Sequence, residues 1–162
     1  MTFKDAVSTC FGKYATFRGR ASRSEMWWFH LFIYILILPL VGIGMFLAIR
    51  QTEASGVSLD QIAQDPKLLT ASGGAAIFCL GLAVLVFLAT FLPSLAVTIR
   101  RLHDRNMSGW WYLGFVLLGQ IPIVGAVISL ATLVIYCLKG TPGDNRFGPD
   151  PLTAQHSADV FT

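Results

Sequence analysis

The chain has 162 residues, of which 54% are hydrophobic and 13% are charged, and its formal net charge is +3. Soluble domains carry about 25% charged residues, so this composition excludes an ordinary soluble protein. The cysteines Cys10, Cys79 and Cys137 lie far apart and have neither zinc-ligand nor redox spacing. Because the sequence also offers no recognisable nucleophile–base pair, we expect no metal ion and no cofactor, and favour a non-enzymatic protein.

The first expected element is a short amphipathic helix at residues 2–14. Apolar residues from Phe3 to Tyr14 recur there at helical spacing. Thr2 and Asp5 have the spacing of an N-terminal capping signal. A basic amphipathic helix before a membrane span is expected to lie in the membrane interface.

Three long apolar runs follow, at residues 27–49, 74–99 and 110–138, and none contains Asp, Glu, Lys or Arg. A transmembrane helix needs about 20 apolar residues, so each run is long enough to cross a bilayer. Gly, Gln and Pro interrupt the third run at 119–122. It forms either one kinked span, or a half-helix over 111–118 followed by a span over 121–138.

These runs predict an all-α membrane protein, a small helical bundle of three spans preceded by the interfacial helix. Its parts are a basic amphipathic segment (1–26), a transmembrane domain (27–138) and a Gly/Pro-rich tail (139–162). We expect the tail to be disordered after about residue 152, because its turn-forming residues end there.

Lys and Arg are distributed unevenly between the apolar runs. Five precede the first run, two lie in the first loop, three in the second loop and two in the tail. The positive-inside rule therefore predicts a multi-pass protein with a cytoplasmic N-terminus and second loop. A single crossing by the third run places the tail outside, whereas a re-entrant half-helix returns it to the cytoplasm.

Tryptophan pairs open the first and third apolar runs. Aromatic residues at such positions are typical of the headgroup level of a bilayer. We expect an interface belt made of Trp27, Trp28, Trp110 and Trp111. Stacking of these rings on a ligand is the alternative.

Basic residues gather in motifs next to the runs. Arginine binds phosphate with two parallel hydrogen bonds, and each basic residue near a membrane attracts anionic lipid by about 1 kcal/mol. The candidates for an anion or lipid-headgroup site are Arg18, Arg20, Arg23, Arg100, Arg101, His103, Arg105 and Arg146. The alternative is that these charges only set topology and extend to the headgroups.

Glycine, proline, serine, asparagine and acidic residues lie in the same motifs as these cations. Ser22 and Glu25 match a capping box at the start of the first span. The tail is expected to form a rigid polar loop that docks on the basic motifs; the alternative is a turn that only ends the last span. The structural or docking set is Gly19, Ser22, Glu25, Asp104, Pro142, Gly143, Asp144, Asn145, Gly148, Pro149 and Asp150.

Three motifs carry a family resemblance: FRGRASRSEMWW at 17–28, RRLHD at 100–104 with SGWW at 108–111, and GTPGDNRFGPDP at 140–151. Together they resemble the bacterial inner-membrane proteins grouped as "domain of unknown function 805", over about residues 11–151. The resemblance implies a small multi-spanning protein of the bacterial inner membrane. It implies no activity.

Three function classes follow. The first is a non-enzymatic module that binds anionic lipid headgroups or a protein partner at the cytoplasmic face. The second is a subunit of an oligomeric transporter or channel, although His30 is the one ionisable side chain that can titrate near neutral pH within the apolar runs. The third is an interfacial enzyme acting on a lipid or phosphate. Expected partners are the bilayer, anionic lipid, and a second copy or another membrane protein; no nucleic acid is expected.

Overall fold

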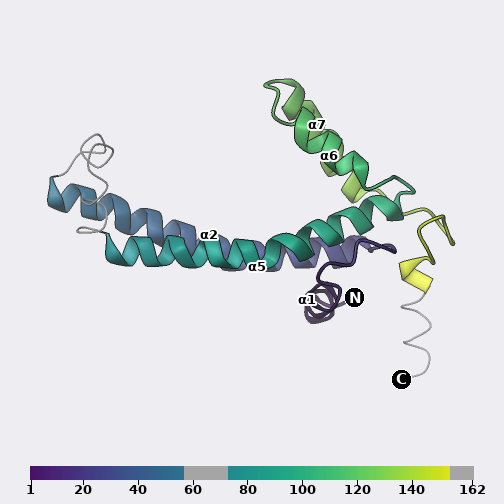
Figure 1. Ribbon diagram of the computed structural model, residues 1–162, viewed down its shortest axis with the longest axis horizontal. Coiled ribbons are helices and arrows are strands. Elements are labelled where there is room, and N and C mark those ends of the chain that lie inside the picture. The colour runs from purple at the N-terminus through teal and green to yellow at the C-terminus, as the bar shows by residue number, and fades with distance from the viewer. Residues whose placement is uncertain (57–72, 154–162) are drawn as a thin grey trace. The chain divides into compact units, whose positions relative to one another are not determined.

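The computed structural model describes residues 1–56 and 73–153, and every named element in these ranges is a helix (Figure 1). The order is α1 (Phe3–Gly12), α2 (Arg23–Ser55), α5 (Gly74–Asp104), α6 (Trp110–Leu118) and α7 (Val124–Cys137). The predicted all-α class is therefore confirmed. The disorder expected after about residue 152 concerns a segment that lies almost entirely outside the described residues.

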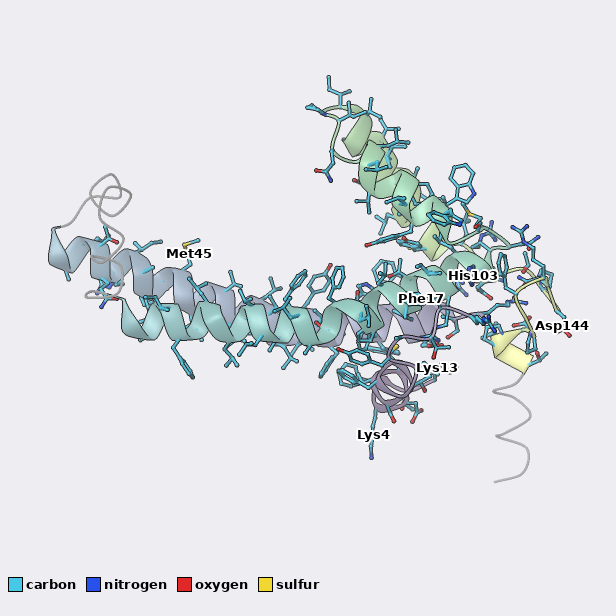
Figure 2. All side chains as sticks on the ribbon, in the orientation of Figure 1. Lys4, Lys13, Phe17, Met45, His103 and Asp144 are labelled. Atoms are coloured by element: carbon cyan, nitrogen blue, oxygen red, sulfur yellow. The ribbon has the colours of Figure 1, made fainter. Side chains whose placement is uncertain are left out.

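Helix α1 is the expected amphipathic N-terminal helix. The Thr2 hydroxyl accepts a hydrogen bond from the Asp5 N–H, and the Asp5 carboxylate accepts one from the Thr2 N–H, so the capping box is complete. Ala6 and Cys10 are fully buried on its inner face. Lys4 extends from its outer face (Figure 2).

Helices α2 and α5 have 33 and 31 residues, which gives lengths of about 50 and 46 Å at 1.5 Å per residue. Both are long and apolar enough to cross a membrane. Because they coincide with the first two apolar runs, the sequence pattern located both correctly.

The third apolar run is split into α6 and α7, which contact each other. The break lies at residues 119–123. The run is therefore divided after a short first helix, as in the expected form with a half-helix over 111–118. The turn is tight, because an added Cβ at Gly125 would lie only 3.0 Å from the Gly119 carbonyl carbon. Helix α7 has 14 residues and is about 21 Å long.

By their packing, the residues divide into two units, Met1–His30 with Leu92–Thr162, and Leu31–Phe91. Among the described residues, the second unit contains α2 from Leu31 to its end and the first part of α5, as far as Phe91. Gly44 permits close approach there, since an added Cβ would lie 3.0 Å from the Leu80 Cγ and 3.3 Å from the Cys79 Cβ. Most of its large apolar side chains, such as Phe46, Phe78 and Leu85, are exposed, as a lipid-facing surface requires.

The first unit holds α1, the start of α2, the end of α5, α6, α7 and the tail. Two contacts anchor the α6–α7 pair at the end of α5. Gly109, just before α6, lies against Ile99 and His103, and Arg101 donates hydrogen bonds to the carbonyls of Tyr136 and Leu138 at the end of α7. The pair therefore starts and finishes at the same place.

Candidate functional site

All three sequence motifs meet at the end of α5. The Ala21 N–H donates to the Arg100 carbonyl at 3.1 Å, and the Thr141 N–H donates to the Asp104 carbonyl at 2.8 Å. Figure 2 shows His103, near the end of α5, and Asp144, in the tail after α7. The N-terminal segment and the tail are thus both hydrogen-bonded to α5.

Arg20 is the centre of this assembly, with only 1% of its side chain exposed. Its Nε donates to the Asp104 Oδ1 at 2.9 Å. Its Nη1 donates to the Gly143 carbonyl and its Nη2 to the Thr141 carbonyl, both at 2.5 Å. A buried charge is stable only when its hydrogen-bonding groups are satisfied, and here the tail carbonyls satisfy them.

Asp104 accepts from a second guanidinium on its other oxygen. The Arg101 Nη1 donates to the Asp104 Oδ2, and its Nε donates to the Tyr136 carbonyl at 3.2 Å. Both side chains are buried. One carboxylate therefore connects the N-terminal segment, through Arg20, with the end of α7, through Arg101.

A second buried ion pair lies between Arg100 and Glu25, whose Nη1 and Oε1 atoms are 2.5 Å apart. The Ser22 hydroxyl accepts from the Glu25 N–H at 3.2 Å, which is the N-cap half of the expected capping box. The Glu25 carboxylate binds Arg100 instead of closing the box. Within the described ranges, the Arg100 Nε and Nη2 atoms have no hydrogen-bond partner.

Helix α1 covers this pair with Cys10, whose sulfur lies 3.9 Å from the Glu25 Oε1. Burial, reinforced by the negative charge of Glu25, raises the pKa of the Cys10 thiol to about 12. The thiol is therefore neutral at physiological pH. Because the thiolate is the reactive form, Cys10 is an inert packing group here.

His103 is held between the N-terminal segment and the tail. Its Nδ1 lies 3.1 Å from the Gly19 carbonyl and must donate the proton, because a carbonyl only accepts. Its ring stacks on Phe147 with centroids 4.0 Å apart and planes 3° apart. The Arg146 guanidinium lies 4.7 Å from the centroid of the same phenyl ring.

The tail itself has a defined conformation. The Asn145 Nδ2 donates to the His103 carbonyl at 3.0 Å and to the Thr141 hydroxyl at 2.9 Å. Gly140 is needed for close approach, since an added Cβ would lie 2.6 Å from the Asp104 Cγ. Gly143 has a φ of +69°, which side-chain-bearing residues rarely adopt.

The remaining basic candidates are more accessible. Arg18, Arg23 and Arg146 are exposed, whereas Arg105 is half-buried and donates from its Nη1 to the Lys139 carbonyl. Arg23 donates from its Nη1 to the Cys137 carbonyl at 3.3 Å. The predicted belt residues are all exposed, namely Trp27, Trp28, Trp110 and Trp111.

A cleft of about 900 Å³ adjoins the buried cluster. Its walls come from the start of α2, the ends of α5 and α7, and the tail. The side chains that matter chemically are Arg23, Ser24, Trp27, Asp104, Lys139 and Asp150.

Ser24, Lys139 and Thr141, which line this cleft, are not among the residues that the sequence pattern singles out. Lys139 directly follows the third apolar run, and that position is the one sequence signal for it. Pro142 and Asp150 line the same cleft and belong to the expected docking set. Pro149 is exposed, and the Gly148 carbonyl lies 3.5 Å from the Arg20 Nη1.

Comparison with known proteins supports the membrane assignment. The chain is 37% identical over 138 residues to inner membrane protein YhaH of Escherichia coli K12, which covers 85% of this chain and 88% of the relative. It is 36% identical over 138 residues to inner membrane protein YhaI of the same strain, covering 85% and 87%. No solved structure matches the chain.

A family model also matches residues 14–149, which include the first two motifs that meet at the end of α5 and the third as far as Pro149. Its description is "Protein of unknown function (DUF805)". With two long apolar helices and relatives in the bacterial inner membrane, the chain is an integral membrane protein and belongs to the DUF805 family.

Proposed function

We propose that this protein is a non-enzymatic membrane module that binds the phosphate of an anionic lipid headgroup, at the cytoplasmic face, in the cleft beside the buried arginine cluster. The single observation that carries the proposal is that this cleft presents the exposed cations Arg23 and Lys139 next to the ends of two apolar runs.

The level of the cleft in the membrane favours a lipid. Trp27 is the first residue of the first apolar run, and Cys137 is the second-last residue of the third. Both line the cleft. Because apolar runs end where the hydrocarbon core ends, a cleft with such walls is expected at headgroup depth.

The different burial of the basic residues supports the same assignment. Arg20 and Arg101 donate to Asp104 and to backbone carbonyls, and Arg100 is paired with Glu25. These buried cations build the framework of the site. Arg23 and Lys139 are exposed, and in the described part of the chain neither forms a salt bridge. They are the cations available to a ligand.

The test is lipid binding by purified full-length protein in nanodiscs that contain phosphatidylglycerol in phosphatidylcholine. We expect the double variant Arg23→Gln/Lys139→Gln to bind phosphatidylglycerol roughly thirtyfold more weakly, from about 1 kcal/mol per basic residue.

The matched control is Lys4→Gln/Lys13→Gln, which removes two exposed cations of the N-terminal segment that do not line the cleft. It should retain binding. An equal loss in both double variants would mean a diffuse attraction of positive charge for the membrane and would contradict a specific site.

A further inference from the structure

The cleft contains a carboxylate whose position calls for a hydrogen-bond donor on the ligand. Asp150 lines the cleft and is half-buried, and no cation among the described residues pairs with it. Its Oδ2 accepts from the Gly143 N–H at 3.2 Å, and its Oδ1 from the Leu152 N–H at 2.9 Å. A carboxylate has about four acceptor positions, so each oxygen can accept one more hydrogen bond.

Asp104, the other carboxylate in the cleft, is different. Its two oxygens accept from Arg20 and Arg101, and both arginines are buried. Asp104 is therefore committed to the framework. Of the two carboxylates in the cleft, Asp150 is the one free to take a proton donor from a ligand.

The charge of the lining selects among phosphates. Arg101 and Asp104 belong to the buried framework with Arg20. The charged groups of the lining that remain for a ligand are Arg23, Lys139 and Asp150, which together carry one net positive charge. A phosphodiester carries one negative charge and neutralises it. A phosphomonoester carries about −1.5 to −2 at pH 7 and would leave an excess of negative charge.

The two observations together define a ligand class. We infer, building on the proposed function, that the cleft binds a phosphodiester lipid whose headgroup bears a neutral hydroxyl group, as phosphatidylglycerol does. Arg23 and Lys139 hold the phosphate, and Asp150 accepts a hydrogen bond from the headgroup hydroxyl. An ammonium headgroup would satisfy Asp150, but it would cancel the charge of the phosphate and leave the cleft positive.

The test compares four lipids with identical acyl chains in phosphatidylcholine nanodiscs: phosphatidylglycerol, phosphatidic acid, phosphatidylethanolamine and a phosphatidylcholine reference. Binding to the full-length protein is measured by native mass spectrometry. We expect phosphatidylglycerol to bind about tenfold more tightly than phosphatidic acid, because it alone adds a hydroxyl donor to a singly charged phosphate.

Asp150→Asn should remove this preference, leaving phosphatidylglycerol no tighter than phosphatidic acid. It removes the negative charge and leaves one acceptor oxygen, for which the N–H groups of Gly143 and Leu152 already compete. The control is Asp144→Asn, an exposed residue of the same tail that does not line the cleft. Its Oδ1 accepts from the Asp150 N–H at 3.4 Å, and an Asn side chain keeps that acceptor. If Asp150→Asn fails to fold, the ranking of lipids by the unmodified protein still decides the question.

The outcomes separate the two proposals. Equal binding of phosphatidic acid and phosphatidylglycerol would overturn the ligand class and leave the proposed function standing. If neither exceeds phosphatidylcholine, both proposals fail. Displacement of phosphatidylglycerol by soluble glycerol 3-phosphate at equal concentration would identify a soluble ligand and overturn the lipid assignment.

Discussion

At the scale of single residues, Arg20 holds the tail against α5. Its guanidinium uses the geometry of a fork, with Nε on Asp104 and both Nη atoms on tail carbonyls. Lysine has the charge but not the fork. We expect Arg20→Lys to lower the free energy of unfolding by about 3–5 kcal/mol, because both tail carbonyls lose a hydrogen bond to a charged group, each worth about 1.5–3 kcal/mol.

The measurement is thermal unfolding in detergent combined with limited proteolysis of the tail. Arg18→Lys is the control, because Arg18 is exposed and lies in the same segment. A tail that stays equally resistant to protease in Arg20→Lys would show that Arg20 does not hold it.

Cys10 gives a prediction about pH. Its pKa is raised from 9.0 to about 12, chiefly by burial, so the folded protein keeps the thiol protonated where the unfolded chain ionises. The stabilisation is fully present below about pH 9 and is lost as the pH rises from there towards about 12. We expect Cys10 to resist iodoacetamide at pH 8, while the exposed Cys137 reacts.

Peptide mass spectrometry after a timed pulse of reagent distinguishes the two cysteines. Repeating the pulse in denaturant provides the reference in which both react. Equal rates in the folded protein would contradict the burial of Cys10 beneath α1.

At the scale of elements, the α6–α7 turn stores strain. Ile123 has a φ of +68°, although it is β-branched, and its side chain is 85% exposed. Its ψ is −57°, and the Val124 N–H donates to the Pro122 carbonyl at 2.7 Å, so Ile123 is the central residue of a γ-turn. Such a strained conformation costs a residue with a Cβ about 1–3 kcal/mol, whereas glycine adopts a positive φ more readily. Ile123→Gly should therefore raise the free energy of unfolding by about that amount.

Chemical unfolding in mixed micelles measures the change. Val127→Gly, at an exposed position inside α7, is the matched control and should lower stability by about 0.3–0.5 kcal/mol, the difference in helix propensity between valine and glycine. If both substitutions destabilise the protein equally, the turn is not strained at Ile123.

At the scale of the whole molecule, the path of α6 and α7 decides which motifs can meet. The pair leaves and returns to the end of α5, and the tail then binds Arg20 from the N-terminal segment. We therefore expect the N-terminus and the tail on the same side of the membrane, which the positive-inside rule predicts to be the cytoplasm.

A single cysteine at Thr162, in a variant lacking Cys10, Cys79 and Cys137, should be protected from a membrane-impermeant thiol reagent in intact cells and labelled after lysis. A cysteine at Gln64, between the two long spans, should be labelled in intact cells. Labelling of Thr162→Cys in intact cells would place a bilayer between the tail and Arg20.

The sequence predictions succeeded where the interacting residues lie close together in the sequence. The α1 capping box involves residues three positions apart, and the two long helices follow from continuous apolar runs. The capping box at Ser22 formed only in part, because Glu25 pairs with Arg100, which lies 75 positions away. A local pattern identifies a local partner and cannot exclude a distant competitor.

The sequence by itself determined the class of this protein, since it contains three apolar runs of 23, 26 and 29 residues without Asp, Glu, Lys or Arg, each long enough to cross a bilayer. It also identified the three motifs that contain most of the buried cluster. Only the tertiary structure showed which basic residues build the framework and which can bind a ligand. Arg20, Arg100 and Arg101 are buried, whereas Arg23 and Lys139 are exposed. Arg20 and Gly143 are 123 positions apart. Their contact depends on the return of α7 to the end of α5. Packing between distant segments decides which charged side chains are buried, and local periodicity in the sequence does not contain that information.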